Sequence, residues 1–128
     1  AQLLHELHGQ YKMVVVTNNA VEAAEYALRD NHIYDYFECV VGREMMDHLK
    51  PSPDGFLYVL NKYNHIPAEE WISVGDSWID GKAATSVGID FISYRADRGK
   101  MNKNGIVPEA EIQDLAELKR MINKFQID

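Results

Sequence analysis

Residues 71–80 read WISVGDSWID. The first four form a short apolar run of the kind that makes a strand buried in a parallel sheet. Asp76 follows directly after this run, and Asp80 comes four residues later, where a helix is expected to begin. That spacing brings both carboxylates to one face of the turn. The stretch therefore predicts a strand, a tight Gly-Asp-Ser turn and a helix, with an acidic pair at their junction.

The acidic pair requires a positive partner. Two carboxylates ~4 Å apart repel by about 4 kcal/mol at an effective dielectric constant of 20. A hard dication offsets this repulsion, and Mg²⁺ commonly takes one or two carboxylates together with waters and phosphate oxygens. The simpler alternative is structural: Asp76 would cap the helix and Asp80 would interact with its dipole.

The rest of the chain alternates between strand and helix patterns. Strands are expected at residues 13–16, 38–41, 71–74, 90–94 and 110–112, and helices at 20–29, 54–63, 79–87 and from Asp114 onward. Residues 43–48 suggest a helical turn, and residues 95–107 a surface loop. The last helix would bury Leu115, Leu118, Met121, Ile122 and Phe125. The pattern predicts an α/β fold in a single domain over residues 1–128: a three-layer, Rossmann-like parallel sheet with right-handed crossovers and helices on both faces.

Two further polar clusters are candidates for a site, since ligands bind beyond the carboxyl ends of parallel strands. Thr17 and Asn18 follow the strand at 13–16, where a hydroxyl and free helix N–H groups can donate to an anion. Lys50 precedes Pro51 and Pro53, which fix the backbone and hence the origin of the ammonium group. Taken singly, these residues are better explained as an N-cap and a solvated lysine.

Composition narrows the function further. The net charge of −7 argues against nucleic-acid and anionic membrane partners. No apolar run reaches the ~20 residues of a membrane span, and no signal peptide is expected. Cys39 is the single cysteine and is expected to be a buried small hydrophobe, which favours a cytoplasmic location. The five histidines show no metal-ligand spacing.

Together these motifs resemble the haloacid dehalogenase (HAD) superfamily, above all its phosphoglycolate-phosphatase-type members. The likeness runs from about Tyr11 to Phe125 and rests on strand-Thr17-Asn18, residues 50–54 (KPSPD) and residues 75–80 (GDSWID). It implies a Mg²⁺-dependent phosphomonoester hydrolase with a phospho-aspartyl mechanism, acting on a small phosphorylated metabolite. Thr17, Asn18 and Lys50 would bind substrate, with Thr17 and Lys50 also catalytic, and Asp76 and Asp80 would hold the metal.

One motif of that family is missing. Its members carry an aspartate nucleophile, followed two residues later by a second aspartate, at the end of an apolar strand. No Asp-x-Asp occurs among the 128 residues, and neither that strand nor a cap domain fits before residue 13. In the family, this strand lies between the Thr17 and Asp76 strands. We therefore expect the chain alone to be inactive, with the strand supplied by an N-terminal segment or by another chain.

Two other interpretations remain. A non-catalytic HAD-like binding or regulatory domain would explain the absent nucleophile but not the charged cluster at Lys50, Asp76 and Asp80. A receiver domain has a similar length, but receivers place their acidic pair on the first strand and their lysine near the end. The order found here is the opposite.

Overall fold

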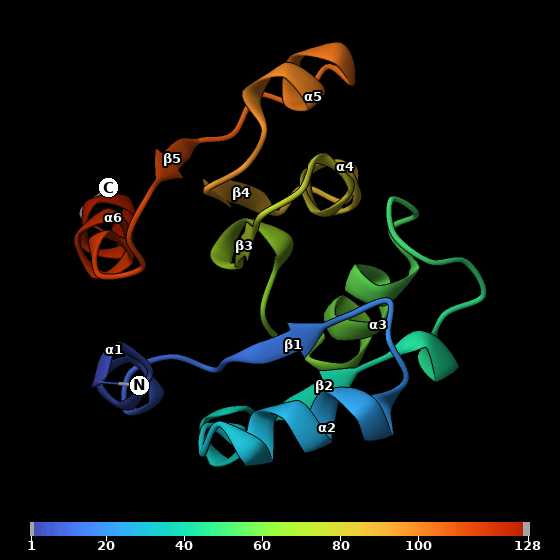
Figure 1. The fold of residues 1–128 in the computed structure, drawn as a ribbon, viewed down its shortest axis with the longest axis vertical. Coiled ribbons are helices and arrows are strands. Elements are labelled where there is room, and N and C mark those ends of the chain that lie inside the picture. The colour runs from blue at the N-terminus through green and yellow to red at the C-terminus, as the bar shows by residue number, and fades with distance from the viewer. Residues whose placement is uncertain (1, 127–128) are drawn as a thin grey trace.

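A computed structural model describes residues 2–126, with side chains described as far as residue 122. Figure 1 shows its strands and helices in space. The strands are β1 Val14–Val16, β2 Cys39–Val41, β3 Ile72–Gly75, β4 Asp90–Tyr94 and β5 Ala110–Ile112. The α-helices are α1 Gln2–His8, α2 Val21–Asp30, α3 Asp54–Lys62, α4 Trp78–Thr85, α5 Arg98–Lys103 and α6 Glu117–Gln126. Three 3₁₀ turns lie at Tyr34–Tyr36, Arg43–Met45 and Ala68–Glu70.

The strands form two separate parallel sheets. β1 pairs with β2, and β3, β4 and β5 pair in that order. Figure 1 shows β1 and β3 as the facing strands of the two sheets. No strand pairing joins β1 to β3 among the described residues.

β1 and β3 nevertheless run in the same direction. At their starts, the Lys12 ammonium lies 5.8 Å from the centre of the Tyr63 ring, and the Trp71 ring lies 5.8 Å from the same tyrosine. At their ends, the Lys50 ammonium bonds both the carbonyl of Val16 and the carboxylate of Asp80. The carboxyl ends of both sheets thus meet at one rim, as the predicted site requires.

Helices cover both faces of these sheets. One apolar cluster is centred on Leu7, Ile92, Ile112 and Leu118, so it joins α1 and α6 to β4 and β5. A second cluster joins α3 and α4 through Phe56, Ala83, Ala84 and Ile89. The predicted α/β architecture, with parallel strands between helical layers, is confirmed.

The five predicted strands are present, but two are less buried than expected. Val74 in β3 keeps 39% of its surface exposed, and the three valines of β1 are half-buried. Cys39 is also half-buried rather than fully buried. An all-apolar strand of a parallel sheet is normally covered on both faces and paired on both edges. β1 and β3 each lack a neighbour on the edge that faces the other sheet.

The predicted surface loop at residues 95–107 is wrong, because it contains α5. Asp97 caps this helix by accepting a hydrogen bond from the Lys100 N–H. Met101 and Ile106 are buried against Phe91. These two apolar residues lie in a polar, glycine-containing stretch and are too few to show a helical periodicity in the sequence. Their burial is nevertheless enough to hold one short helix against the core.

The predicted helix caps are also partly wrong. Ala20 is the N-cap of α2, and no side chain caps it. Ser77, not Asp76, caps α4 by accepting from the Ile79 N–H. Gly88, two residues after the α4 C-cap Ser86, adopts a φ of +83°, which favours glycine.

The last helix begins three residues later than expected. Asp114 accepts from the Ala116 N–H, and Glu117 accepts from the N–H groups of Gln113 and Asp114. Leu118, Met121 and Ile122 join the core, but Leu115 is 42% exposed. The Phe125 side chain lies outside the described side chains. No described helix is long and apolar enough to cross a membrane.

Candidate functional site at the sheet rim

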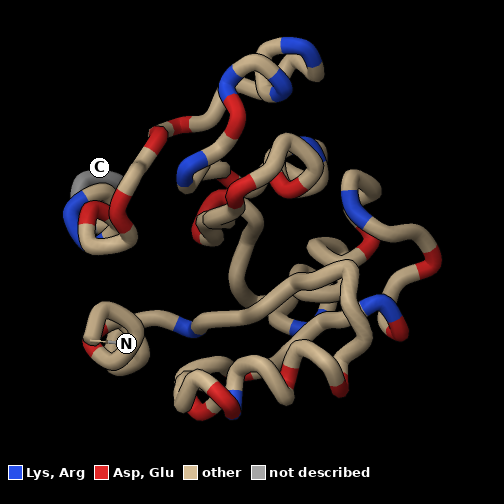
Figure 2. Tube along the Cα trace, in the orientation of Figure 1, with Lys and Arg blue, Asp and Glu red and all other residues tan. Residues whose placement is uncertain are grey.

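A groove of about 1180 Å³ separates β1 from β3. Its walls are the two strands, and helices α1, α3 and α6 contribute apolar side chains to it. Lys50 and Asp80 line its end at the carboxyl rim. Figure 2 shows that β1 and β2 carry no charged residue, so the charges nearest to these two strands lie on the elements around them.

Lys50 and Asp80 form the central contact of the site. The Lys50 Nζ lies 2.6 Å from Asp80 Oδ1 and donates a second hydrogen bond of 2.9 Å to the Val16 carbonyl. The two side chains are 11% and 13% exposed. An ion pair screened from water in this way is held much more firmly than one on the open surface.

Asn18 fixes the backbone of Lys50. Its Nδ2 donates to the Lys50 carbonyl at 3.2 Å, and its Oδ1 accepts from the Lys50 N–H at 2.8 Å. The Asn18 side chain thus joins the end of β1 to the lysine loop, an arrangement that its sequence position did not predict. Thr17 Oγ1 accepts from the Asn19 N–H at 3.1 Å, which holds the hydroxyl at the same rim.

Gly75 allows Asp80 to lie over the end of β3. A Cβ at Gly75 would fall 2.6 Å from the Asp80 carboxylate, too close for any real contact. Glycine is therefore required for this close approach rather than for an unusual φ. Asp76 follows Gly75 directly in the chain, so its backbone adjoins this close contact.

Asp76 itself is exposed. No hydrogen bond or ion pair joins Asp76 to Lys50 or Asp80 in the described part of the chain. Asp76 is thus the more exposed of the two acids that were predicted to hold the metal, since the Asp80 side chain is only 13% exposed. Across residues 2–126 no group of three or more metal-ligating side chains gathers. Two carboxylates nevertheless fit Mg²⁺, which usually keeps several waters and binds few protein ligands.

Asp54 is a supporting residue that sequence reasoning did not single out. Its carboxylate accepts from the His48 N–H at 2.7 Å, which closes the loop that carries Lys50. This hydrogen bond, with smaller contributions from Ser52 and His48, holds the pKa of Asp54 below its usual value of 3.8. The sequence feature that could have revealed Asp54 is its position as the first residue of α3, where a carboxylate is favoured.

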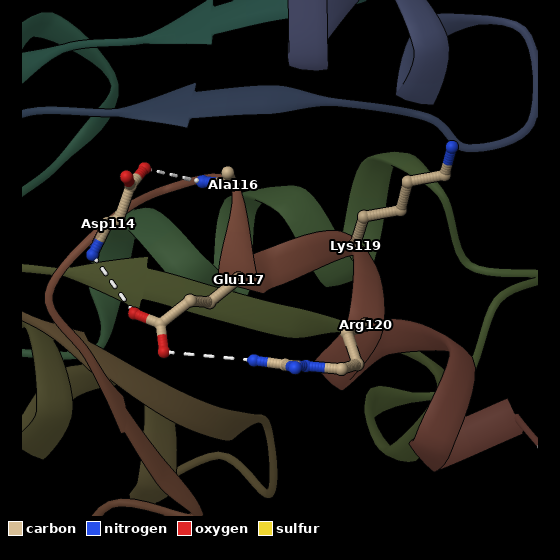
Figure 3. Close-up of a pocket in the computed structure, with 5 residues that line it drawn as sticks. All are labelled: Asp114, Ala116, Glu117, Lys119 and Arg120. Atoms are coloured by element: carbon tan, nitrogen blue, oxygen red, sulfur yellow. Dashed lines mark hydrogen bonds and ion pairs between the residues drawn. The ribbon is translucent and has the colours of Figure 1, made fainter.

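A second hollow, of about 510 Å³, lies beside α6. Figure 3 shows its lining residues, Asp114, Ala116, Glu117, Lys119 and Arg120. The Asp114 and Glu117 carboxylates are occupied by helix-end N–H groups and by Arg120 at 4.0 Å. Lys119 pairs with Glu6 on α1. The hollow is therefore the capped end of a helix and lies apart from the rim site.

The sequence of this chain is similar to those of known hydrolases. YfnB of Bacillus subtilis, named as a HAD-hydrolase, is 30% identical over 122 residues, which cover 94% of this chain and 52% of YfnB. Phosphoglycolate phosphatase of Thiobacillus denitrificans is 29% identical over 118 residues, covering 88% of this chain and 49% of that protein. The chain thus spans about half the length of the curated relatives it matches.

Solved structures of related proteins have the same fold as this chain. A crystal structure of YfnB bound to magnesium superposes with a TM-score of 0.81 at 26% identity, over 95% of this chain and 52% of that one. The crystal structure of a predicted phosphoglycolate phosphatase from Haemophilus somnus superposes with a TM-score of 0.82 at 25% identity. The match covers 94% of this chain and 54% of that one. The haloacid dehalogenase-like hydrolase family matches residues 1–94. The chain belongs to the haloacid dehalogenase-like hydrolase family.

Proposed function

We propose that this chain forms the phosphate- and magnesium-binding half of a phosphomonoester hydrolase, acting on a small phosphorylated metabolite. The observation that carries the proposal is the contact of Lys50 with Asp80 at the rim where β1 and β3 both end. An ammonium group held against Asp80, with Asp76 following the end of β3, offers the charges that a metal-bound phosphoryl group requires.

Each rim residue has a distinct role in this proposal. Lys50 offsets the negative charge of the phosphoryl group, and its position is fixed by Asn18. Thr17 donates its hydroxyl to a phosphoryl oxygen. Its Oγ1 already accepts from the Asn19 N–H, so the hydroxyl proton points elsewhere. The main-chain N–H of Asn18 serves the same anion, because its side chain is engaged with Lys50.

Asp76 and Asp80 would hold Mg²⁺. The exposed Asp76 carboxylate offers direct ligands, and Gly75 leaves the space that Asp80 needs beside it. When bound, Mg²⁺ supplies charge neutralisation for the phosphoryl oxygens. The magnesium-bound structure of YfnB supports this assignment by likeness.

The nucleophile would come from outside these 128 residues, because the chain holds no Asp-x-Asp. A carboxylate that attacks phosphorus forms an aspartyl phosphate, which is a mixed anhydride, as the bond between phosphorus and the departing alcohol breaks. Water then cleaves the aspartyl phosphate, which releases inorganic phosphate and restores the carboxylate. We propose that the strand carrying this carboxylate lies between β1 and β3 and ends beside Lys50.

The test mixes the 128-residue chain with Mg²⁺ and a synthetic peptide in which Asp-x-Asp follows an apolar strand. We expect p-nitrophenyl phosphate to be hydrolysed by the mixture and not by the chain alone. Lys50→Ala should abolish turnover, whereas Lys103→Ala, at the exposed last residue of α5, should retain it. Turnover by the chain alone, lost in Asp76→Asn, would contradict the proposal. So would an equally active peptide with asparagine in place of its first aspartate.

The absent nucleophile also favours a second candidate, a non-catalytic HAD-like regulatory domain. The same mixture separates the two candidates. A regulatory domain would bind the aspartate-bearing peptide and show no turnover with any phosphomonoester offered.

A further inference from the structure

We infer that Glu44 is a positioning residue: its carboxylate caps helix α2 from a distant part of the chain and thereby holds the Thr17–Asn18 turn at the rim. This deepens the proposed function and rests on it, because Thr17 and Asn18 are the residues proposed to bind the phosphoryl group. Glu44 lies in the 3₁₀ turn Arg43–Met45 after β2, 23 residues beyond the start of the helix that it caps.

The connection between β1 and α2 supplies no side-chain cap of its own. Ala20 is the N-cap of α2 and has no side chain that could accept a hydrogen bond. Thr17 Oγ1 accepts from the Asn19 N–H, and the Asn18 side chain is bonded to the backbone of Lys50. The polar side chains expected to cap the helix are therefore engaged elsewhere, although the first N–H groups of a helix have no partner within it.

Glu44 supplies a cap from outside the helix. Val21 is the first residue of α2, and its N–H donates to Glu44 Oε1 at 2.9 Å. This hydrogen bond is the main cause that lowers the pKa of Glu44 below its usual value of 4.5, so the carboxylate is charged at neutral pH. The helix dipole favours a negative charge at this end of a helix.

The end of β2 and the turn after it hold the connection at two further points. The Thr17 N–H donates to the Val41 carbonyl at 2.9 Å, and the Arg43 N–H donates to the Asn19 carbonyl at 2.9 Å. These bonds join main-chain atoms, so almost any residue could make them. The contact at the start of α2 is different, because it requires the acceptor side chain of Glu44.

Gly42 lets the two segments come close enough for this contact. A Cβ at Gly42 would lie 2.7 Å from the Val21 nitrogen and 2.9 Å from the Asn19 carbonyl oxygen. The φ of −111° at Gly42 is open to other residues, so glycine is required here for space. The turn that carries Glu44 therefore packs directly on the start of α2.

The cap and the charge of Glu44 should act on phosphate binding in opposite directions. An acid repels an anion, so loss of the charge alone should strengthen binding. Loss of the cap should weaken it, because Thr17 and Asn18 would then have to be ordered on binding. Glutamine separates the two effects, since it is neutral and its carbonyl oxygen can still accept from the Val21 N–H.

The first test measures binding of inorganic phosphate to the 128-residue chain with Mg²⁺ by isothermal titration calorimetry. We expect Glu44→Ala to weaken binding about fivefold, and Glu44→Gln to bind at least as tightly as the wild type. Glu22→Ala is the matched control, because Glu22 is an exposed acid in the first turn of α2. This control should bind phosphate as tightly as the wild type or slightly more tightly.

The second test measures amide hydrogen exchange by NMR without phosphate. The Lys50 N–H donates to Asn18 Oδ1, so its exchange rate reports whether Asn18 stays in place. We expect the Val21 and Lys50 amides to exchange about fivefold faster in Glu44→Ala, and at the wild-type rate in Glu44→Gln. If the chain folds only with the aspartate-bearing peptide, all variants are compared in that mixture.

Unchanged exchange of the Lys50 amide in Glu44→Ala would overturn the inference. So would tighter phosphate binding by that variant, or equal losses in Glu44→Ala and Glu44→Gln. A Glu44→Ala chain that does not fold would also overturn it, since Glu44 would then maintain the whole fold rather than one turn. A wild-type chain that binds no phosphate would refute the proposed function, and the exchange rates would still decide the role of Glu44.

Discussion

Lys50 Nζ and Asp80 Oδ1 lie 2.6 Å apart at the carboxyl rim, although 30 residues separate them in the chain. Lys50 lies in the loop before α3, on the side of the β1–β2 sheet, and Asp80 lies in the first turn of α4, which follows β3 of the other sheet. The contact therefore joins the two halves of the rim. Val16 adds a carbonyl to the same ammonium group.

Removing one partner of this pair should cost about 3 kcal/mol of unfolding free energy, because it leaves the other charge largely screened from water and unpaired. Lys50→Met and Asp80→Asn together should cost less than the sum of the two single changes. Urea denaturation of the four proteins gives the coupling energy. The exposed Lys119–Glu6 pair is the matched control and should show much weaker coupling. Equal coupling in both pairs would contradict the special status of the rim contact.

Gly75→Ala should destabilise the chain by about 1–3 kcal/mol, since the new methyl group would overlap the Asp80 carboxylate. Gly9→Ala is the control, because a Cβ at Gly9 meets nothing within 4 Å. Thermal and denaturant unfolding measure both variants, and a crystal structure of Gly75→Ala should show Asp80 displaced from Lys50. If Gly75→Ala proved as stable as Gly9→Ala, Asp80 would not pack against the end of β3.

Met101→Ala should cost about 2–5 kcal/mol, as expected for a large apolar side chain that is 4% exposed. Leu57→Ala, at a position that is 47% exposed, should change stability by only ~0.5 kcal/mol. Chemical denaturation compares the two variants. A small loss for Met101→Ala would show that residues 95–107 are the surface loop predicted from the sequence rather than a packed helix.

Acid should loosen the lysine loop through Asp54. The His48 N–H lowers the folded-state pKa of Asp54 below its unfolded value, so the carboxylate stabilises the fold above about pH 4. That contribution is lost as the pH falls through the folded-state pKa. Asp54→Asn should therefore be less stable than the wild type at neutral pH, with the difference narrowing at about pH 3. A constant difference at both pH values would exclude this role.

The sequence predicted the order of strands and helices well, and the reasons are clear. Residues 90–94 and 110–112 form strands with the expected limits, because their apolar runs end at charged or turn-forming residues. Lys50 was predicted to meet the acidic turn, and it contacts Asp80. The roles of Thr17, Asn18, Lys50, Asp76 and Asp80 in binding and catalysis stay predictions.

What the sequence did not reveal depends on contacts between distant residues. Asn18 looked like a cap or an anion donor, yet it binds the backbone of Lys50, 32 residues away. Gly75 has the pattern of a simple turn residue, and only the fold shows Asp80 packed against it. α5 was missed because its stability comes from Met101 and Ile106 packing on Phe91, which leaves no periodic signal.

The most direct test of the central claim is where a divalent cation binds. Mn²⁺, which takes the same oxygen ligands as Mg²⁺, broadens NMR signals of nearby amides. With inorganic phosphate present, we expect broadening centred on Gly75, Asp76 and Asp80, extending to Thr17 and Lys50 and lost in Asp76→Asn. Broadening centred on Glu69 and Glu70, with sharp signals from Gly75 to Asp80, would contradict the account.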